Sequence, residues 1–309
     1  PVVSIFYDLI PLIHSNLYLE SNPQFSKYYK SKLKKIKHLD GLLAISESSA
    51  TEAIQYLNYN PKNIFNISSA CNVEIFNITE DVEFTLSDVV KKYSPFILYS
   101  GASDPRKNIQ RLLKAYGQLP VDLKHYKLIL VGNLLVPEIN LINQWIKDFN
   151  INSENVYKTG FISDSDLVGL YRKCSLFVFP SLHEGFGLPI LEAMSCGASV
   201  IGSNSTSIPE VIGMKQAMFD PCNVNEITDL ITKALKDIKF ISELKNNANL
   251  QSKKFSWNKS AKLAIEAFEY FTKNKMINKY KTYDLVQSHN KSNFDLLIKK
   301  INSYRRKNF

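Results

Sequence analysis

The chain has 309 residues and a net charge of +9, and 45% of its residues are hydrophobic. This composition is typical of a globular protein with a buried core, and the length is sufficient for two domains. No apolar run approaches the roughly 20 residues of a membrane-spanning helix, and the four cysteines lie too far apart in sequence to indicate a zinc site or a disulfide scaffold. We therefore expect a protein of a reducing, cytoplasmic compartment.

Residues 1–80 also alternate between predicted strands and helices, as in an α/β domain, but with few strands. Apolar strands are expected at 2–7 and 41–46, and helices at 24–38 and 48–58. Because two or three strands make a small sheet, we expect this segment to be the closing part of a domain whose beginning lies outside this sequence.

A second domain is expected over residues 81–255, where short apolar runs alternate with helical segments. Strands without polar alternation, separated by helices, are typical of a parallel sheet that is covered on both faces. In "NIQRLLKAYGQL", Ile109, Leu112, Leu113 and Tyr116 follow one face of a helix. The sequence therefore predicts a doubly wound α/β domain, with strands at 95–101, 126–133, 155–161, 175–181 and 199–204.

The segment "SLHEGFGLPILEAMSCG" (181–197) follows one of these strands directly. In an open parallel sheet, ligands bind beyond the carboxyl ends of the strands, where the next helices begin. Glu184 is expected in the loop and Glu192 in the first helical turn, with Gly185 and Gly187 allowing close approach to a ligand. Free N–H groups at a helix start bind phosphate, and carboxylates accept hydrogen bonds from hydroxyls. This pattern predicts a sugar-nucleotide site, although Glu192 could instead only complement the helix dipole.

The same segment resembles the donor-site signature of the retaining glycosyltransferases of family 4, which contain an E-x7-E motif. Further stretches match in the same order, so the resemblance is strong over about residues 95–236 and looser over 1–70. These stretches are "ILYSGASDPRKNIQRLLKAY", "LILVGN", "VYKTGFISDSDLVGLYRKCSLFVFPS" and "FDPCNVNEITDLITKAL". The resemblance implies a GT-B architecture, in which two Rossmann-like domains face each other across a cleft and the second holds the donor.

The function that this resemblance implies is the metal-independent transfer of a hexose, with retention, from a nucleoside-diphosphate sugar to a glycan or lipid-linked glycan. No cofactor is implied beyond the donor substrate. Because "DPRKN" is similar to mannosyl- and related transferases of surface-polysaccharide assembly, GDP-mannose is the leading donor.

The resemblance also assigns roles to residues of this chain. Glu184 would contact the donor sugar beside its anomeric carbon, and Glu192 the ribose hydroxyls. Lys107 matches the family's phosphate-binding lysine and would stabilise the leaving diphosphate, with Arg106 as a second cation. The other donor-binding positions are the backbone of Gly185, Phe186, Gly187 and Leu188, and the turn at Gly160, Phe161 and Ile162 beside the base.

The chain departs from the family pattern at two places. Many members have an arginine after the glycine that ends the first donor-domain strand, where this chain has Ala102. Members often have a histidine before an aspartate at the rim of the first domain, where this chain has Tyr7 and Asp8. We expect Asp8 to contact the donor sugar or the acceptor hydroxyl, the alternative being an aspartate that only forms a turn.

Two further motifs are interpreted as structural. Asp164 and Asp166 form a D-x-D sequence that binds metal in other glycosyltransferases, but their position before "LVGLYRK" favours a helix start. His183 precedes Glu184, and we interpret it as a bystander. No metal site is expected, because the five histidines form no cluster with carboxylates at metal spacing.

Residues 256–309 are expected to form a basic helical tail. From Lys253 to Phe309 there are 14 Lys and Arg against 4 Asp and Glu, so the rest of the chain is close to neutral. An apolar stripe predicts a helix that either contacts an anionic membrane, at its inner face, or packs back onto the first domain. The stripe consists of Phe294, Leu297, Ile298 and Ile301.

The sequence leaves two other function classes as alternatives. A noncatalytic binding or scaffold subunit is favoured by Ala102 and by the short first domain, and opposed by the intact Glu184, Glu192 and Lys107. A nucleic-acid-binding protein is disfavoured, because the charge is confined to one tail and no such motif is present.

Overall fold

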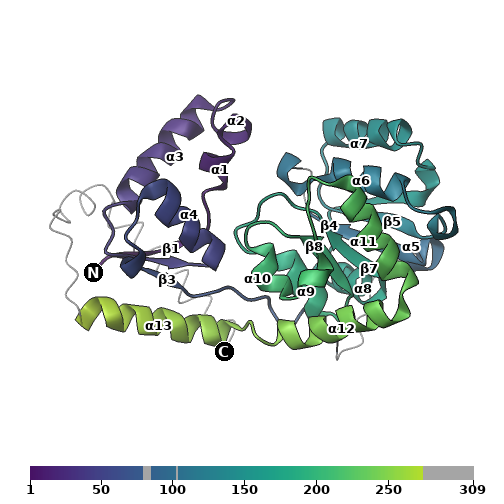
Figure 1. The fold of residues 1–309 in the computed structure, drawn as a ribbon. Helices are drawn as coiled ribbons and strands as arrows, with labels where there is room; N and C mark the ends of the chain where they lie inside the picture. The colour runs from purple at the N-terminus through teal and green to yellow at the C-terminus, as the bar shows by residue number, and fades with distance from the viewer. Residues whose placement is uncertain (79–84, 102–103, 274–309) are drawn as a thin grey trace.

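The computed structural model describes residues 1–78, 85–101 and 104–273. It contains two parallel sheets with helices packed around them, and α13 runs back from the second domain to the first (Figure 1). The predictions for Ala102 and for the stripe at 294–301 lie outside the described residues. Within the described ranges, no helix combines the length and the apolarity needed to cross a membrane.

The first domain is built on a three-stranded parallel sheet in the order β1-β2-β3. Its strands are β1 (Val3–Phe6), β2 (Gly41–Ala44) and β3 (Ile64–Asn66), and its helices are α1 (Ile10–Ile13), α2 (Ser15–Tyr18), α3 (Pro23–Ile36) and α4 (Glu47–Leu57). The α4 helix begins after Ser46, whose side chain accepts a hydrogen bond from the N–H of Ser49, as an N-cap does.

The second domain has a six-stranded parallel sheet in the order β6-β5-β4-β7-β8-β9. Counted from its first strand, this order is 3-2-1-4-5-6, which is that of the Rossmann fold. The prediction of a doubly wound α/β domain is thus confirmed. The strands are β4 (Phe96–Ser100), β5 (Lys127–Val131), β6 (Val156–Gly160), β7 (Leu176–Phe179), β8 (Val200–Ser203) and β9 (Met218–Phe219). The helices are α5 (Ser87–Tyr93), α6 (Ile109–Gly117), α7 (Val136–Asp148), α8 (Asp164–Lys173), α9 (Leu188–Ser195), α10 (Ile208–Ile212), α11 (Val224–Lys236) and α12 (Ile238–Ser252).

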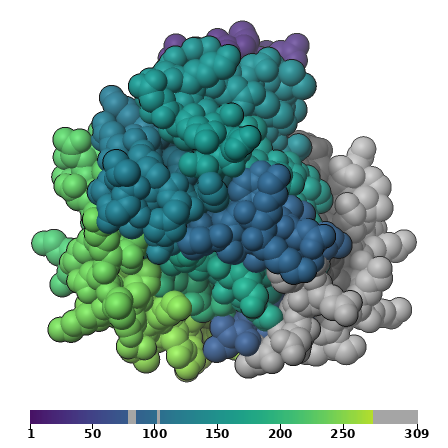
Figure 2. All heavy atoms as spheres, turned by 90° about the vertical axis from the view of Figure 1, so that its right-hand side faces the viewer, coloured from purple at the N-terminus to yellow at the C-terminus, as the bar shows by residue number. Residues whose placement is uncertain are grey.

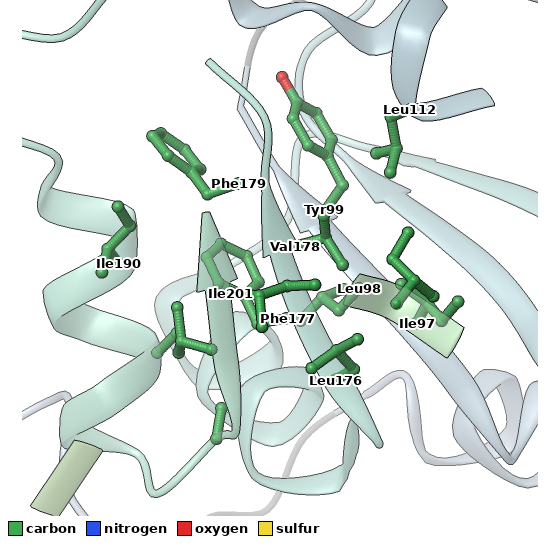
Figure 3. Close-up of a cluster of buried hydrophobic side chains, with 14 of the residues drawn as sticks. Ile97, Leu98, Tyr99, Leu112, Leu176, Phe177, Val178, Phe179, Ile190 and Ile201 are labelled. Carbon is green, nitrogen blue, oxygen red and sulfur yellow. The ribbon is translucent and has the colours of Figure 1, made fainter. Parts of the chain in front are cut away.

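The core of the second domain lies on both faces of this sheet. Leu98 and Phe177 come from the adjacent central strands, while Leu112 of α6 and Ile190 of α9 approach the strands from different sides (Figure 3). All four are fully buried, and burial of each such side chain contributes about 1.5–3 kcal/mol. Figure 2 views the molecule from the side of the second domain, which makes up most of the coloured surface. A strip of the first domain is visible at the top.

The last described helix, α13 (Trp257–Lys273), packs against β2 and β3 of the first domain rather than against the second (Figure 1). Phe271 and Ala267 are fully buried there with Leu43. The ring of Phe271 lies where a side chain at Gly41 would be, 2.0 Å from an ideal Cβ. The α3 and α4 helices cover the opposite face of the small sheet, so α13 completes the first domain (Figure 1).

Candidate functional site

The loops after β4 and β7 meet at the point where the strand order of the second sheet reverses. Connections from these two neighbouring strands leave on opposite faces, which opens a crevice at their carboxyl ends. The N–H of Leu182 donates to the carbonyl of Arg106 at 2.7 Å. The buried amide of Asn108 donates to the carbonyls of Pro180 and Pro221 at 3.0 and 2.7 Å, so the two loops hold each other in place.

Glu184 is held between two cations in this crevice. Its Oε1 accepts from Lys107 Nζ at 2.7 Å, and its Oε2 lies 3.0 Å from Arg106 Nη1. Ser181 donates to Oε1 at 2.6 Å. The structure therefore brings together Glu184, Arg106 and Lys107, three residues that the sequence assigned to one site. With Asp104 beside Arg106 as well, the two cations face two carboxylates, so the cluster is close to neutral.

Arg106 is held on several sides. Its Nη1 also donates to the carbonyl of His183 at 2.8 Å, while Nε faces Asp104 at 3.7 Å, too far for a hydrogen bond. Burial lowers the pKa of the Arg106 guanidinium, but the charges of Glu184 and Asp104 outweigh it and raise the pKa. Tyr18 of the first domain donates to Asp104, so this cluster also contacts the opposite domain.

Asp8 lies directly against the loop that carries Glu184. An ideal Cβ at Gly185 would come within 2.9 Å of Asp8 Oδ2 and 3.0 Å of the carbonyl oxygen of Tyr7, so only glycine fits here. Asp8 Oδ1 accepts from the N–H of Ile10 at 3.0 Å, so the aspartate also forms the turn given as its alternative role. Burial raises the pKa of the Asp8 carboxyl.

The start of α9 differs from its predicted geometry. The helix begins at Leu188 after Gly187, whose φ of 105° is reached readily only by glycine, and no side chain caps it. The side chain of Phe186 is buried against Phe255, so only the backbone of Phe186 is free to contact a ligand. Glu192 is the fifth helical residue. It lies beyond the first turn, which corrects its predicted position and removes the simple dipole role.

Glu192 lies against α8. The hydroxyl of Tyr171 donates to Glu192 Oε2 at 3.4 Å. Burial is the main cause that raises the pKa of Glu192, to about 7, and the charge of Asp164 adds to it. Asp164 follows the turn at Gly160–Ile162 by two residues, and Phe161 in that turn is 86% exposed. Glu192 thus lies near the start of α8, which this turn directly precedes in the chain.

Asp164 and Asp166 begin α8, as the sequence predicted. Asp166 is buried and accepts hydrogen bonds from Ser163 and from the backbone and hydroxyl of Thr85, which lower its pKa despite burial. Its oxygens therefore anchor the segment before α5. Within the described ranges, no group of three His, Cys, Asp or Glu side chains is placed to bind a metal ion.

Sequence reasoning missed a chain of three residues across the domain interface. His183, interpreted above as a bystander, is buried, and its Nε2 lies 2.7 Å from Glu52 Oε1 of α4. Its Nδ1 lies 3.2 Å from Nε2 of His14, and Glu52 Oε2 accepts from the N–H of Leu9 at 2.8 Å. The sequence did contain one signal for these contacts, because Glu52 is a carboxylate on the buried face of α4, next to Ala53.

The fold and the crevice together define a two-domain protein of the Rossmann type with paired cations and carboxylates at the switch point of its second sheet. The model of the family "Glycosyl transferases group 1" matches residues 87–251, more than half of the chain. The chain belongs to this family. The resemblance noted for its motifs is confirmed.

Two of the similar proteins are mannosyltransferases of Escherichia coli. The chain is 43% identical over 270 residues to the serotype-specific mannosyltransferase WbdA of Escherichia coli, which covers 86% of this chain and 33% of WbdA. It is 34% identical over 238 residues to the O-antigen chain mannosyltransferase B of Escherichia coli, covering 74% of this chain and 60% of that protein. The chain thus spans about a third of the length of WbdA.

Solved structures share the fold. The Anabaena protein Alr3699/HepE, in complex with UDP and glucose, superposes with a TM-score of 0.71 at 20% identity, covering 88% of this chain and 72% of that one. Sucrose-phosphate synthase from Thermosynechococcus elongatus superposes with a TM-score of 0.70 at 21% identity, covering 87% of this chain and 68% of that one. The GT-B fold predicted from the resemblance is confirmed.

Proposed function

We propose that the chain is a retaining mannosyltransferase that moves mannose from GDP-mannose to a glycan or lipid-linked glycan. The observation that carries this proposal is the carboxylate of Glu184, held between Arg106 and Lys107 and adjacent to Gly185, which lies against Asp8. The cations offer a diphosphate site, and the two acids offer acceptors for sugar hydroxyls. Identity to two mannosyltransferases supports the choice of sugar.

In the proposed reaction, the bond between the anomeric carbon of the donor sugar and the diphosphate oxygen breaks, and the acceptor oxygen forms a bond to the same face of that carbon. The acceptor proton passes to the leaving phosphate, so no strong protein base is needed. Lys107 and Arg106 stabilise the charge that develops on the diphosphate. Membership of the family with the E-x7-E motif supports retention.

The proposed chemistry uses no metal ion. Arg106 and Lys107 supply the positive charge that a divalent cation would otherwise bring to the leaving group. Asp166, one of the two D-x-D acids, is already saturated by hydrogen bonds at the start of α8. The basic residues from Lys253 onward would bring the enzyme to an anionic membrane surface at which lipid-linked acceptors lie, and nucleic acid is not a proposed partner.

The proposal is tested by incubating the protein with GDP-mannose and an α-linked mannotriose, and by following GDP release and chain extension. NMR of the product should show a new α-linkage. UDP-glucose serves as the control donor. No release from either donor while GDP binds would favour the noncatalytic scaffold instead, whereas GDP release without extension would show donor cleavage and would rule out mannotriose as the acceptor.

A further inference from the structure

A cavity of about 440 Å³ lies between α4 of the first domain and the loops after β7 and β8 of the second. This volume is within the roughly 300–1,000 Å³ of small-molecule pockets. Tyr56, Gln55 and Thr51 line it from α4, and His183 and Thr206 line it from the second domain. The cavity therefore spans the interface and adjoins the loop that carries Glu184.

The α4 side of the cavity presents polar groups together with an aromatic ring. Thr51, Gln55 and Tyr56 are all exposed, with Tyr56 at 49%. Their side chains make no hydrogen bond to any residue in the described ranges. Thr51 and Gln55 are four positions apart, so they share one face of the helix. A hydroxyl, an amide and a phenol are thus available to a ligand.

Thr206 connects this cavity to the Glu184 loop. Its Oγ1 accepts from the N–H of Glu184 at 3.0 Å, so its own hydroxyl hydrogen remains available to a ligand. Its φ of 51° lies in the left-handed region, which is rare for a β-branched residue. Such strained positions cluster at functional sites. The strain is consistent with a threonine held where it contacts both Glu184 and a bound molecule.

The charge of the lining selects the chemistry of the ligand. Among the residues that the structure describes, no Lys or Arg lines the cavity, and its acid, Glu52, already accepts hydrogen bonds from His183 and the backbone of Leu9. The cavity thus offers no countercharge to a phosphate. Hydroxyl and amide groups beside a tyrosine ring suit a neutral ligand that has many hydroxyls on one side and C–H groups on the other.

We propose that this cavity is the subsite for the neutral sugar at the acceptor end of the glycan. The inference rests on the proposed transfer reaction, because it gives the acceptor a place separate from the Arg106–Lys107 anion site. Tyr56 stacks on the apolar face of the sugar, while Gln55, Thr51 and Thr206 bind its hydroxyls. Specificity for the acceptor therefore resides largely in the exposed face of α4.

The test compares Tyr56→Ala and Gln55→Ala with Ile54→Ala, a matched control, because Ile54 is exposed on α4 and does not line the cavity. With GDP-mannose and mannotriose, we expect the KM for mannotriose to rise at least tenfold in the two cavity variants. The KM for the donor and the affinity for GDP should stay unchanged. Equal KM values for mannotriose in all three variants would overturn the subsite.

A second measurement separates this inference from the proposed function. Saturation-transfer NMR of mannotriose with the protein and GDP needs no turnover. Loss of the signal in Tyr56→Ala, with its retention in Ile54→Ala, supports the subsite even if GDP-mannose is not the donor. An unchanged signal in Tyr56→Ala refutes the subsite, whereas absence of GDP binding by the wild type refutes the proposed function.

Discussion

Replacement of Glu184 by glutamine should strengthen the binding of GDP while slowing transfer. In the structure, the carboxylate lies 2.7 Å from Lys107 Nζ and 3.0 Å from Arg106 Nη1, so it neutralises part of the charge that a diphosphate needs. A phosphate oxygen in contact with either cation would lie within about 6 Å of the carboxylate. At an effective dielectric constant between about 20 and 80, the repulsion at 6 Å is about 0.7–3 kcal/mol.

That energy corresponds to a dissociation constant for GDP about 3- to 100-fold lower in Glu184→Gln. Turnover should fall by about two to three decades, the loss typical of one preorganised polar contact in a reacting site. Calorimetric titration with GDP measures the first effect, and steady-state transfer the second. Because the repulsion is electrostatic, the gain in affinity should shrink as the ionic strength rises.

The matched control is Glu154→Gln, at an exposed glutamate in the loop before β6. It removes the same charge from the chain without touching the crevice, and its affinity for GDP should equal that of the wild type. If Glu184→Gln binds GDP no more tightly than this control, the carboxylate does not compete with the diphosphate. The assignment of Arg106 and Lys107 as the anion site would then be wrong.

Three further outcomes are expected. Lys107→Ala should weaken GDP binding at least tenfold. Neither Mg²⁺ nor EDTA should alter wild-type activity, and strict dependence on a divalent ion would refute the metal-independent reaction. Burial raises the pKa of Glu192 to about 7, so its stabilisation of the free protein is present at low pH and lost as the pH rises through 7. Ribose hydroxyls donate hydrogen bonds to the ionised carboxylate of Glu192, so the affinity for GDP should rise between pH 6 and 8. In Glu192→Gln the rise should be smaller, because only the ionisation of the GDP phosphate then remains. Gly185→Ala places a Cβ 2.9 Å from Asp8 Oδ2 and should lower the free energy of unfolding by about 1–3 kcal/mol, measured by denaturant titration. The control Asn249→Ala, at an exposed position, should leave that free energy nearly unchanged.

Local signals in the sequence were sufficient for most elements of the second domain. The α8 helix begins where its pattern predicted, because Ser163 caps it and two acids lie in its first turn. The cations and Glu184 were also brought together as expected. Both come from loops that follow neighbouring strands, so the order of the sheet places them at one edge. The two-residue strand β9 was missed because it is too short to show a period.

The contacts between the two domains could not be predicted from the sequence. His183 is 131 residues from Glu52 and 169 from His14, and no local pattern indicates that these side chains meet. Glu192 was predicted in the first helical turn, but the helix begins at Leu188, one position earlier than that prediction requires, so Glu192 is its fifth residue. A change of one position moves a side chain by about 100° around a helix, which is enough to change the neighbours that it meets.

The return of α13 to the first domain affects the order in which a newly made chain folds. Phe271 covers Gly41, and about 230 residues separate them along the chain. A ribosome that adds about 5–20 residues per second needs about 10–50 s to make that stretch. During this time one face of the first sheet, including Leu43, stays uncovered while the second domain can already fold. Of these two domains, the one made earlier is thus the last to have both faces of its sheet covered, and its apolar face stays exposed in the nascent chain until α13 is made.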